Sequence, residues 1–159
     1  MTHLTEGDAA PLFTLALDDG TTVSLDTLKG KPAVLYFYPQ DDTGGCTDEN
    51  KEFSALAQDF ADRRAALIGV SPDDVASHKK FRAKYGLSVP LGADPGRETI
   101  EAFGLWQMKK LYGREFMGLI RTTIIIDAEG RIARIIKATR IKGHAAKVLA
   151  ALDEVIGTA

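Results

Sequence analysis

Four short segments rich in apolar and β-branched residues constrain the fold of this chain more than any other feature. They cover residues 33–38, 65–70, 122–126 and 131–136. The first three are nearly continuous in apolar character, which is typical of strands covered on both faces of a sheet. The last two flank Asp127-Ala-Glu-Gly130, a turn sequence of hairpin length. The pattern therefore predicts a sheet that includes a closing hairpin.

A second small hairpin is predicted near the N-terminus, where residues 13–17 and 21–25 flank Asp18-Asp-Gly20. Helical periods alternate with the strands. Phe53, Leu56, Ala57 and Phe60 form one apolar stripe at helical spacing, which predicts a helix over residues 46–61. Further helices are expected over 73–85 (with Pro72 opening the first turn), 97–103 and 143–156. This alternation predicts an α/β fold with a central mixed β-sheet flanked by helices and an N-terminal β-hairpin extension.

Length and charge exclude several classes of protein. A chain of 159 residues fits one domain, which we expect to cover residues 1–159. A net charge of −2 argues against nucleic acid as a main partner, because phosphate binding favours a strongly basic surface. No apolar run approaches the roughly 20 residues that span a bilayer, so no membrane association is expected.

The chain contains one cysteine, Cys46. This count excludes an intrachain disulfide, a Cys-x-x-Cys dithiol and a cysteine-rich zinc site. The first eight residues carry two acids and no basic or apolar region of a signal peptide. Together these features predict a reducing, cytoplasmic location.

Cys46 occupies a chemically significant position. Extending the apolar stripe back from Phe53 by seven residues places the thiol in the first helical turn, on the inward face. The free N–H groups and dipole of a helix N-terminus favour thiolate over thiol. Gly44 and Gly45 allow a small molecule to approach the backbone closely. The alternative is that Cys46 is only a small buried hydrophobic residue.

The residues around Cys46 resemble a known family. Pro39-x-x-x-Thr43-x-x-Cys46 is similar to the active-site pattern of the peroxiredoxins, which are thiol-dependent peroxidases on a thioredoxin-like fold. Residues 36–49, residues 110–127 and Lys142-Gly-His144 resemble the bacterioferritin-comigratory (Q-type) branch. The resemblance runs from about residue 7 to the C-terminus. It implies a thioredoxin-like fold and a peroxidase that needs no metal or other cofactor.

The resemblance also implies a role for each motif residue. Cys46 is the nucleophile that becomes a sulfenic acid, and Arg121 holds the thiolate and the peroxide. Thr43 orients the peroxide through its hydroxyl, and Pro39 shields the sulfur from water. The backbone N–H groups of Cys46 and Gly45 complete the set of oxyanion donors.

Each assignment has a structural alternative. Thr43 could serve only as the N-cap of its helix. Pro39 could simply end a strand, and Arg121 could be a solvated residue just before a strand. Glu49 lies one turn after Cys46, where it either anchors Arg121 or serves only as a favourable acid near a helix start.

Two positions depart from the branch pattern. Gly44 stands where proline is common, and Lys51 stands where many members place a resolving cysteine. The sulfenic acid therefore needs an external partner. The candidates are thioredoxin, glutaredoxin, glutathione, or a second copy through a Cys46–Cys46 bond.

Other candidate sites are weaker. His78 and His144 lack partners at metal-ligand spacing, so no metal site is expected. Gly44-Gly45 lacks the Lys-Ser/Thr of a nucleotide-binding loop. Residues 106–117 are apolar and aromatic, and they are predicted to form a loop and helix covering the site. The alternative is a docking surface for a reductant or a second subunit.

The sequence thus predicts a peroxidase for hydrogen peroxide and small organic hydroperoxides, acting as a monomer or weak homodimer. The alternatives are a non-enzymatic thioredoxin-fold module, either redox-sensing or chaperone-like, and a structural domain with an inert thiol.

Overall fold

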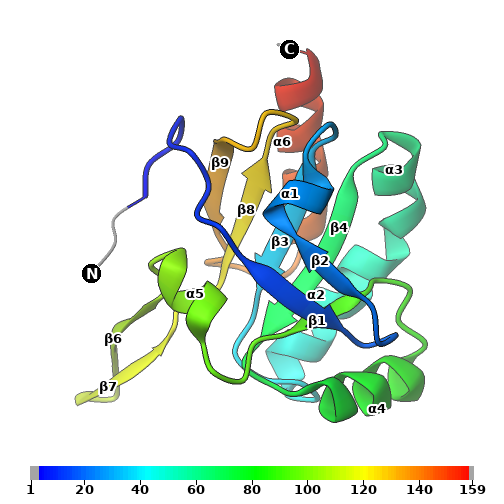
Figure 1. The fold of residues 1–159 in the computed structure, drawn as a ribbon. Helices are drawn as coiled ribbons and strands as arrows, with labels where there is room; N and C mark the ends of the chain where they lie inside the picture. The colour runs from blue at the N-terminus through cyan, green and yellow to red at the C-terminus, as the bar shows by residue number, and fades with distance from the viewer. Residues whose placement is uncertain (1–3, 158–159) are drawn as a thin grey trace.

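The computed structural model describes residues 4–157. Its centre is a seven-stranded sheet with the order β2-β1-β5-β4-β3-β8-β9, and β6 and β7 pair separately (Figure 1). The strands are β1 (Thr14–Leu17), β2 (Thr22–Ser24), β3 (Ala33–Phe37), β4 (Ala66–Ser71), β5 (Leu91–Ala93), β6 (Trp106–Leu111), β7 (Arg114–Leu119), β8 (Thr122–Ile126) and β9 (Ile132–Lys137). β3 pairs in parallel with β4, and β4 with β5, whereas β1–β2, β1–β5, β3–β8 and β8–β9 are antiparallel. The predicted mixed sheet and N-terminal hairpin are confirmed.

Helices cover both faces of this sheet (Figure 1). They are α1 (Leu25–Leu28), α2 (Gly44–Ala55), α3 (Ala57–Asp62), α4 (Val75–Tyr85), α5 (Glu98–Ala102) and α6 (His144–Gly157). Side chains of β3 alternate between two apolar layers. Leu35 and Phe37 pack with α1 and α5, whereas Val34 and Tyr36 pack with α2, α3, α4 and α6. The second layer contains Cys46.

The helix expected over 46–61 is corrected in two respects. It begins at Gly44 rather than Cys46, and it divides at Leu56 into α2 and α3. At the division the Leu56 N–H is shared between the carbonyls of Glu52 and Phe53. The Ser54 carbonyl also accepts a hydrogen bond from the Ser88 hydroxyl, a tertiary contact that sequence periodicity does not register.

The start of the helix expected over 73–85 is also corrected. α4 begins at Val75, and Pro72 lies before it. Asp74 is the N-cap, because its carboxylate accepts a hydrogen bond from the Ser77 N–H at 2.8 Å.

Residues 106–117 do not contain the predicted helix. They form most of the β6–β7 hairpin, which stands out from the main sheet (Figure 1). Its turn residues Tyr112 and Gly113 have φ values of 51° and 75°. Two consecutive left-handed residues match the twist of a tight hairpin, so this turn overrides the aromatic composition that suggested a helix.

No helix within residues 4–157 is long and apolar enough to cross a membrane.

Replacement of Gly69 tests the packing beneath the site. Gly69 on β4 pairs with Tyr36 on β3, and a Cβ at Gly69 would lie 2.7 Å from the Tyr36 ring. Gly69→Ala should therefore lower the free energy of unfolding by about 1–3 kcal/mol, measured by urea denaturation. Gly157→Ala, where a Cβ meets nothing within 4 Å, is the matched control. Equal stability of the two variants would contradict the packing described here.

Candidate active site

The start of α2 presents free backbone donors. Thr43 is the N-cap, and the first helical hydrogen bond joins the Thr47 N–H to the Thr43 carbonyl at 2.8 Å. The N–H groups of Gly44, Gly45 and Cys46 therefore precede the helical hydrogen-bond ladder. Their partial positive charge, with the helix dipole, favours an anion at this point.

The pairing of β3 with β8 brings Arg121 to Cys46. Phe37, the last residue of β3, lies opposite Thr122, the first residue of β8. The chain after β3 leads to Cys46, and Arg121 immediately precedes β8. As a result, the Arg121 Nη2 donates a hydrogen bond to the Cys46 Sγ at 3.3 Å. Arg121 is therefore turned toward the thiol, whereas the non-enzymatic alternative would need Cys46 to react slowly or Arg121 to be turned away.

Glu49 fixes the other side of the guanidinium. The Arg121 Nη1 donates to the Glu49 Oε1 at 2.6 Å, and the Glu49 side chain is 1% exposed. The Arg121 side chain is 19% exposed, so the guanidinium reaches the edge of the protein while its partners lie inside. One cation thus spans a buried carboxylate and a buried sulfur.

The second oxygen of Glu49 faces a histidine. The Oε2 atom is buried, has no hydrogen-bond partner among residues 4–157, and lies 4.0 Å from the His144 Nε2. That nitrogen is 2.8 Å from the Thr123 Oγ1. Burial raises the pKa of Glu49 to about 7 despite the opposing effect of Arg121. Burial, with the charges of Lys147 and Arg121, lowers the pKa of His144 to about 4, so this histidine is neutral at pH 7.

The remaining predicted site residues lie on the loop and helix start around the same point. The Thr43 Oγ1 donates to the Gln40 carbonyl at 2.9 Å and makes no capping bond to the helix. Pro39 is half-buried. A Cβ at Gly45 would lie 2.8 Å from the Ile141 Cδ1 and 3.6 Å from the Arg121 Nη2, so the absence of a side chain lets Ile141 approach.

The loop that carries Pro39 and Thr43 is anchored by residues to which sequence reasoning assigned no role. Asp41 accepts hydrogen bonds from the Tyr38 hydroxyl at 2.6 Å and the Ser77 hydroxyl at 2.8 Å. The His78 Nδ1 lies 2.8 Å from the Asp41 Oδ2, and the His78 Nε2 lies 3.0 Å from the Gly92 carbonyl. His78 is therefore a buried structural residue that ties this loop to β5.

Two further contacts hold the first turn of α2. The Tyr36 hydroxyl donates to the Asn50 Oδ1 at 2.7 Å, and the Asn50 Nδ2 donates to the Cys46 carbonyl at 2.9 Å. Asp42, at a left-handed φ of 58°, accepts from Lys84 and Tyr85. Asp41 and Asp42 lie within the Pro39–Cys46 motif and Asn50 follows it, and this position in the sequence was the available signal.

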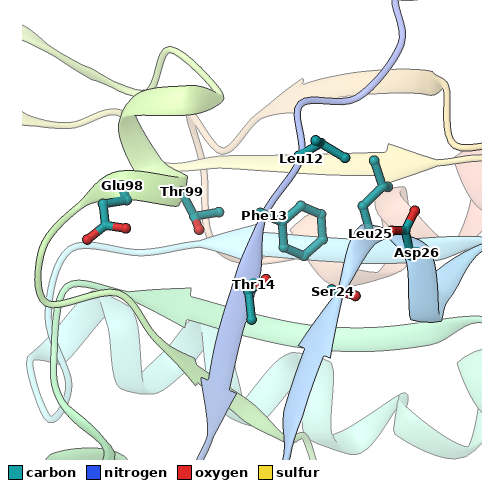
Figure 2. Close-up of a pocket in the computed structure, with 8 residues that line it drawn as sticks. All are labelled: Leu12, Phe13, Thr14, Ser24, Leu25, Asp26, Glu98 and Thr99. Carbon is teal, nitrogen blue, oxygen red and sulfur yellow. The ribbon is translucent and has the colours of Figure 1, made fainter.

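A cavity of 470 Å³ lies away from this site (Figure 2). Phe13, Thr14 and Ser24 line it from the N-terminal hairpin, and Glu98 and Thr99 from α5. Its charged residues are acidic, and none of its lining side chains is a nucleophile for peroxide chemistry. Within residues 4–157 no group of three His, Cys, Asp or Glu side chains is placed to hold a metal ion. The free thiol of Cys46 lies at the start of α2, apart from this cavity.

Comparison with known proteins identifies the family. A profile described as the AhpC/TSA family matches residues 6–135. The chain belongs to this family. Its relatives show that it is a peroxiredoxin of the Bcp/PrxQ type, with a single cysteine, and hence a thiol peroxidase.

The similarity to individual peroxiredoxins covers almost the whole chain. Peroxiredoxin Bcp of Bacillus subtilis is 43% identical over 148 residues, which is 93% of this chain and 94% of that protein. A cysteine-to-serine mutant of PrxQ from Xylella fastidiosa superposes with a TM-score of 0.90 at 32% identity, covering 98% of this chain and 99% of that one. The bacterioferritin comigratory protein of Xanthomonas campestris, described with alkyl peroxide reduction activity, superposes with a TM-score of 0.84 at 37% identity, covering 89% and 90%.

The raised pKa of Glu49 predicts a pH-dependent stability. The Glu49 carboxyl binds its proton more tightly in the folded protein than in the unfolded chain. The stability that this proton binding contributes is therefore lost as the pH rises from about 4.5 to about 7. Glu49→Gln removes this dependence while keeping an acceptor for Arg121. The free energy of unfolding of Glu49→Gln minus that of wild type should therefore be larger at pH 8.5 than at pH 5, by up to about 3 kcal/mol.

Denaturant unfolding at the two pH values measures this difference. Exposed Glu129 supplies the control variant Glu129→Gln, for which the difference from wild type should not change with pH. A pH-independent difference for Glu49→Gln would show that the carboxyl titrates normally in the folded protein.

Proposed function

We propose that this peroxiredoxin reduces hydrogen peroxide and small organic hydroperoxides at Cys46, through a sulfenic acid that an external thiol then reduces. The observation that carries the proposal is the Arg121 guanidinium, which contacts the Cys46 Sγ and the buried Glu49 carboxyl together at the N-terminus of α2. This arrangement supplies positive charge and fixed donors where a thiolate, and then an oxyanion, would need them.

The first step is a displacement on oxygen. The Cys46 thiolate attacks the terminal peroxide oxygen, the S–O bond forms, and the O–O bond breaks. The leaving oxygen takes the bond electrons and a proton and departs as water or an alcohol. A low thiol pKa does not by itself give speed, because nucleophilicity falls with basicity. Donors aimed at the leaving oxygen, Arg121 and the N–H groups of Gly45 and Cys46, therefore supply the acceleration.

Thr43 and Pro39 prepare the peroxide and the thiol. The Thr43 hydroxyl proton is engaged by the Gln40 carbonyl, which leaves its oxygen lone pairs to accept the peroxide O–H. Pro39 has no N–H and keeps water from the sulfur. Positioning of this kind favours in-line attack.

Regeneration requires a second molecule. The chain has no second cysteine, and Lys51 occupies the position where a resolving thiol would stand. We propose an external thiol reductant, of the thioredoxin, glutaredoxin or glutathione kind, acting on a monomer or weak homodimer.

Substitution of Arg121 tests the oxyanion role. Arg121→Ala should slow the oxidation of Cys46 by stoichiometric hydrogen peroxide about 10²-fold or more, followed by loss of free thiol and intact mass. Cys46→Ser should abolish turnover and remain folded. An unchanged rate in Arg121→Ala would mean that Arg121 is structural, and residual peroxidase activity in Cys46→Ser would remove Cys46 from its role.

Substitution of Thr43 separates orientation from helix capping. Thr43→Val removes the hydroxyl and should slow oxidation by about tenfold or more, whereas Thr43→Ser should stay close to wild type. The free energy of unfolding should change by less than about 1 kcal/mol in both, because no capping bond is lost. A large loss of stability with normal oxidation would identify Thr43 as a cap only.

A further inference from the structure

Four cationic side chains surround a small cavity between β9 and α6. Lys137, Arg140, Lys142 and Lys147 line this cavity of 210 Å³, together with His144. All four are exposed, and none of their side chains forms an ion pair or hydrogen bond with another residue of the 4–157 range. Such a concentration of unpaired positive charge stands out in a protein with a net charge of −2. It favours an anionic ligand.

This cationic cavity adjoins the active site. Ala138, at the start of the loop after β9, donates its N–H to the Arg121 carbonyl at 3.0 Å. Ile141, which lies between two of the cations in sequence, packs against Gly45 next to Cys46. His144 lines the cavity and lies 4.0 Å from the Glu49 carboxyl. The segment that forms the cavity therefore also touches the residues that hold the thiol.

One carboxylate lies at the edge of the loop and is already engaged. The Glu52 Oε1 accepts a hydrogen bond from the Gly143 N–H at 3.0 Å. This contact uses a backbone donor and no cationic side chain, so it leaves the four positive charges available to a ligand.

We propose that the cationic cavity binds the carboxylates of a small anionic thiol that reduces the Cys46 sulfenic acid. This inference rests on the proposed function and names the chemical class of its reductant. At 210 Å³ the cavity is below the roughly 300–1,000 Å³ of sites that enclose a whole drug-sized ligand. It fits a carboxylate-bearing end of a small molecule, with the thiol directed toward Cys46, better than it fits a protein surface.

The reduction proceeds in two balanced steps. The bound thiolate attacks the sulfur of the Cys46 sulfenic acid, an S–S bond forms, and the S–O bond breaks to release water after protonation. A second thiolate then attacks the reductant sulfur of this mixed disulfide. The Cys46 thiolate leaves, and the two reductant molecules depart as their disulfide.

Neutralising the cavity tests the proposal. The triple variant Arg140→Gln/Lys142→Gln/Lys147→Gln removes three of the charges. The oxidised enzyme is prepared with stoichiometric hydrogen peroxide and reduced with glutathione, an anionic thiol, or with uncharged 2-mercaptoethanol. The ratio of the two second-order rate constants should fall about tenfold or more in the triple variant, because only glutathione carries carboxylates.

A charge-matched control removes three exposed lysines elsewhere, in Lys31→Gln/Lys79→Gln/Lys80→Gln. Its rate ratio should match that of wild type. Binding of unreactive S-methylglutathione to the reduced enzyme, followed by NMR, should weaken in the cavity variant and not in the control. This binding measurement needs no sulfenic acid. It therefore tests whether the cavity binds the anionic molecule even if wild-type Cys46 fails to oxidise and the proposed function is wrong.

Two results would overturn the inference. One is an unchanged rate ratio with unchanged S-methylglutathione binding in the cavity variant. The other is a loss of reduction by thioredoxin alone, with glutathione unaffected, which would assign the four cations to a protein partner.

Discussion

The structure depends on one guanidinium held between two buried groups. Arg121 contacts the Glu49 carboxyl through Nη1 and the Cys46 sulfur through Nη2. This cation stands between the buried Glu49 carboxyl and the buried Cys46 sulfur, and a buried ionisable group is costly without a partner of this kind. Because burial raises the pKa of Glu49 to about 7, this carboxyl is partly protonated at neutral pH and only partly neutralises the Arg121 charge. Under the proposed function, the remaining positive charge of Arg121 acts on the Cys46 sulfur and on an incoming peroxide.

The surrounding fold supports this contact from several sides. The antiparallel pairing of β3 with β8 brings the two chain segments together, and Asn50 and Tyr36 tie the first turn of α2 to β3. Asp41, through Tyr38 and Ser77, fixes the loop that carries Pro39 and Thr43. These supports are largely buried and hydrogen-bonded, which suits a site whose donors must be positioned before the reaction begins.

Much of the fold was predictable because a strand that is buried on both faces is apolar at nearly every position, as in residues 33–37 and 122–126. The position of Cys46 in the first turn of a helix followed from the helical spacing of the apolar residues after it. The Arg121 contact was implied only by the family resemblance, since a charged residue before a strand otherwise indicates a solvated end. The β6–β7 hairpin was missed because a turn made by two left-handed residues, Tyr112 and Gly113, leaves no signal in the spacing of apolar residues. The approach of His144 to Glu49 was missed because it depends on how α6 packs against α2. The cationic cavity was missed because it depends on how the loop between β9 and α6 folds.

The most direct test of this account is the second-order rate constant for oxidation of wild-type Cys46 by near-stoichiometric hydrogen peroxide. The same thiol in the urea-unfolded chain and free cysteine are the references. We expect the folded enzyme to react orders of magnitude faster than both and to gain one oxygen by intact mass. A folded-state rate equal to that of the unfolded chain would show that Arg121 and the helix N-terminus do not activate this thiol.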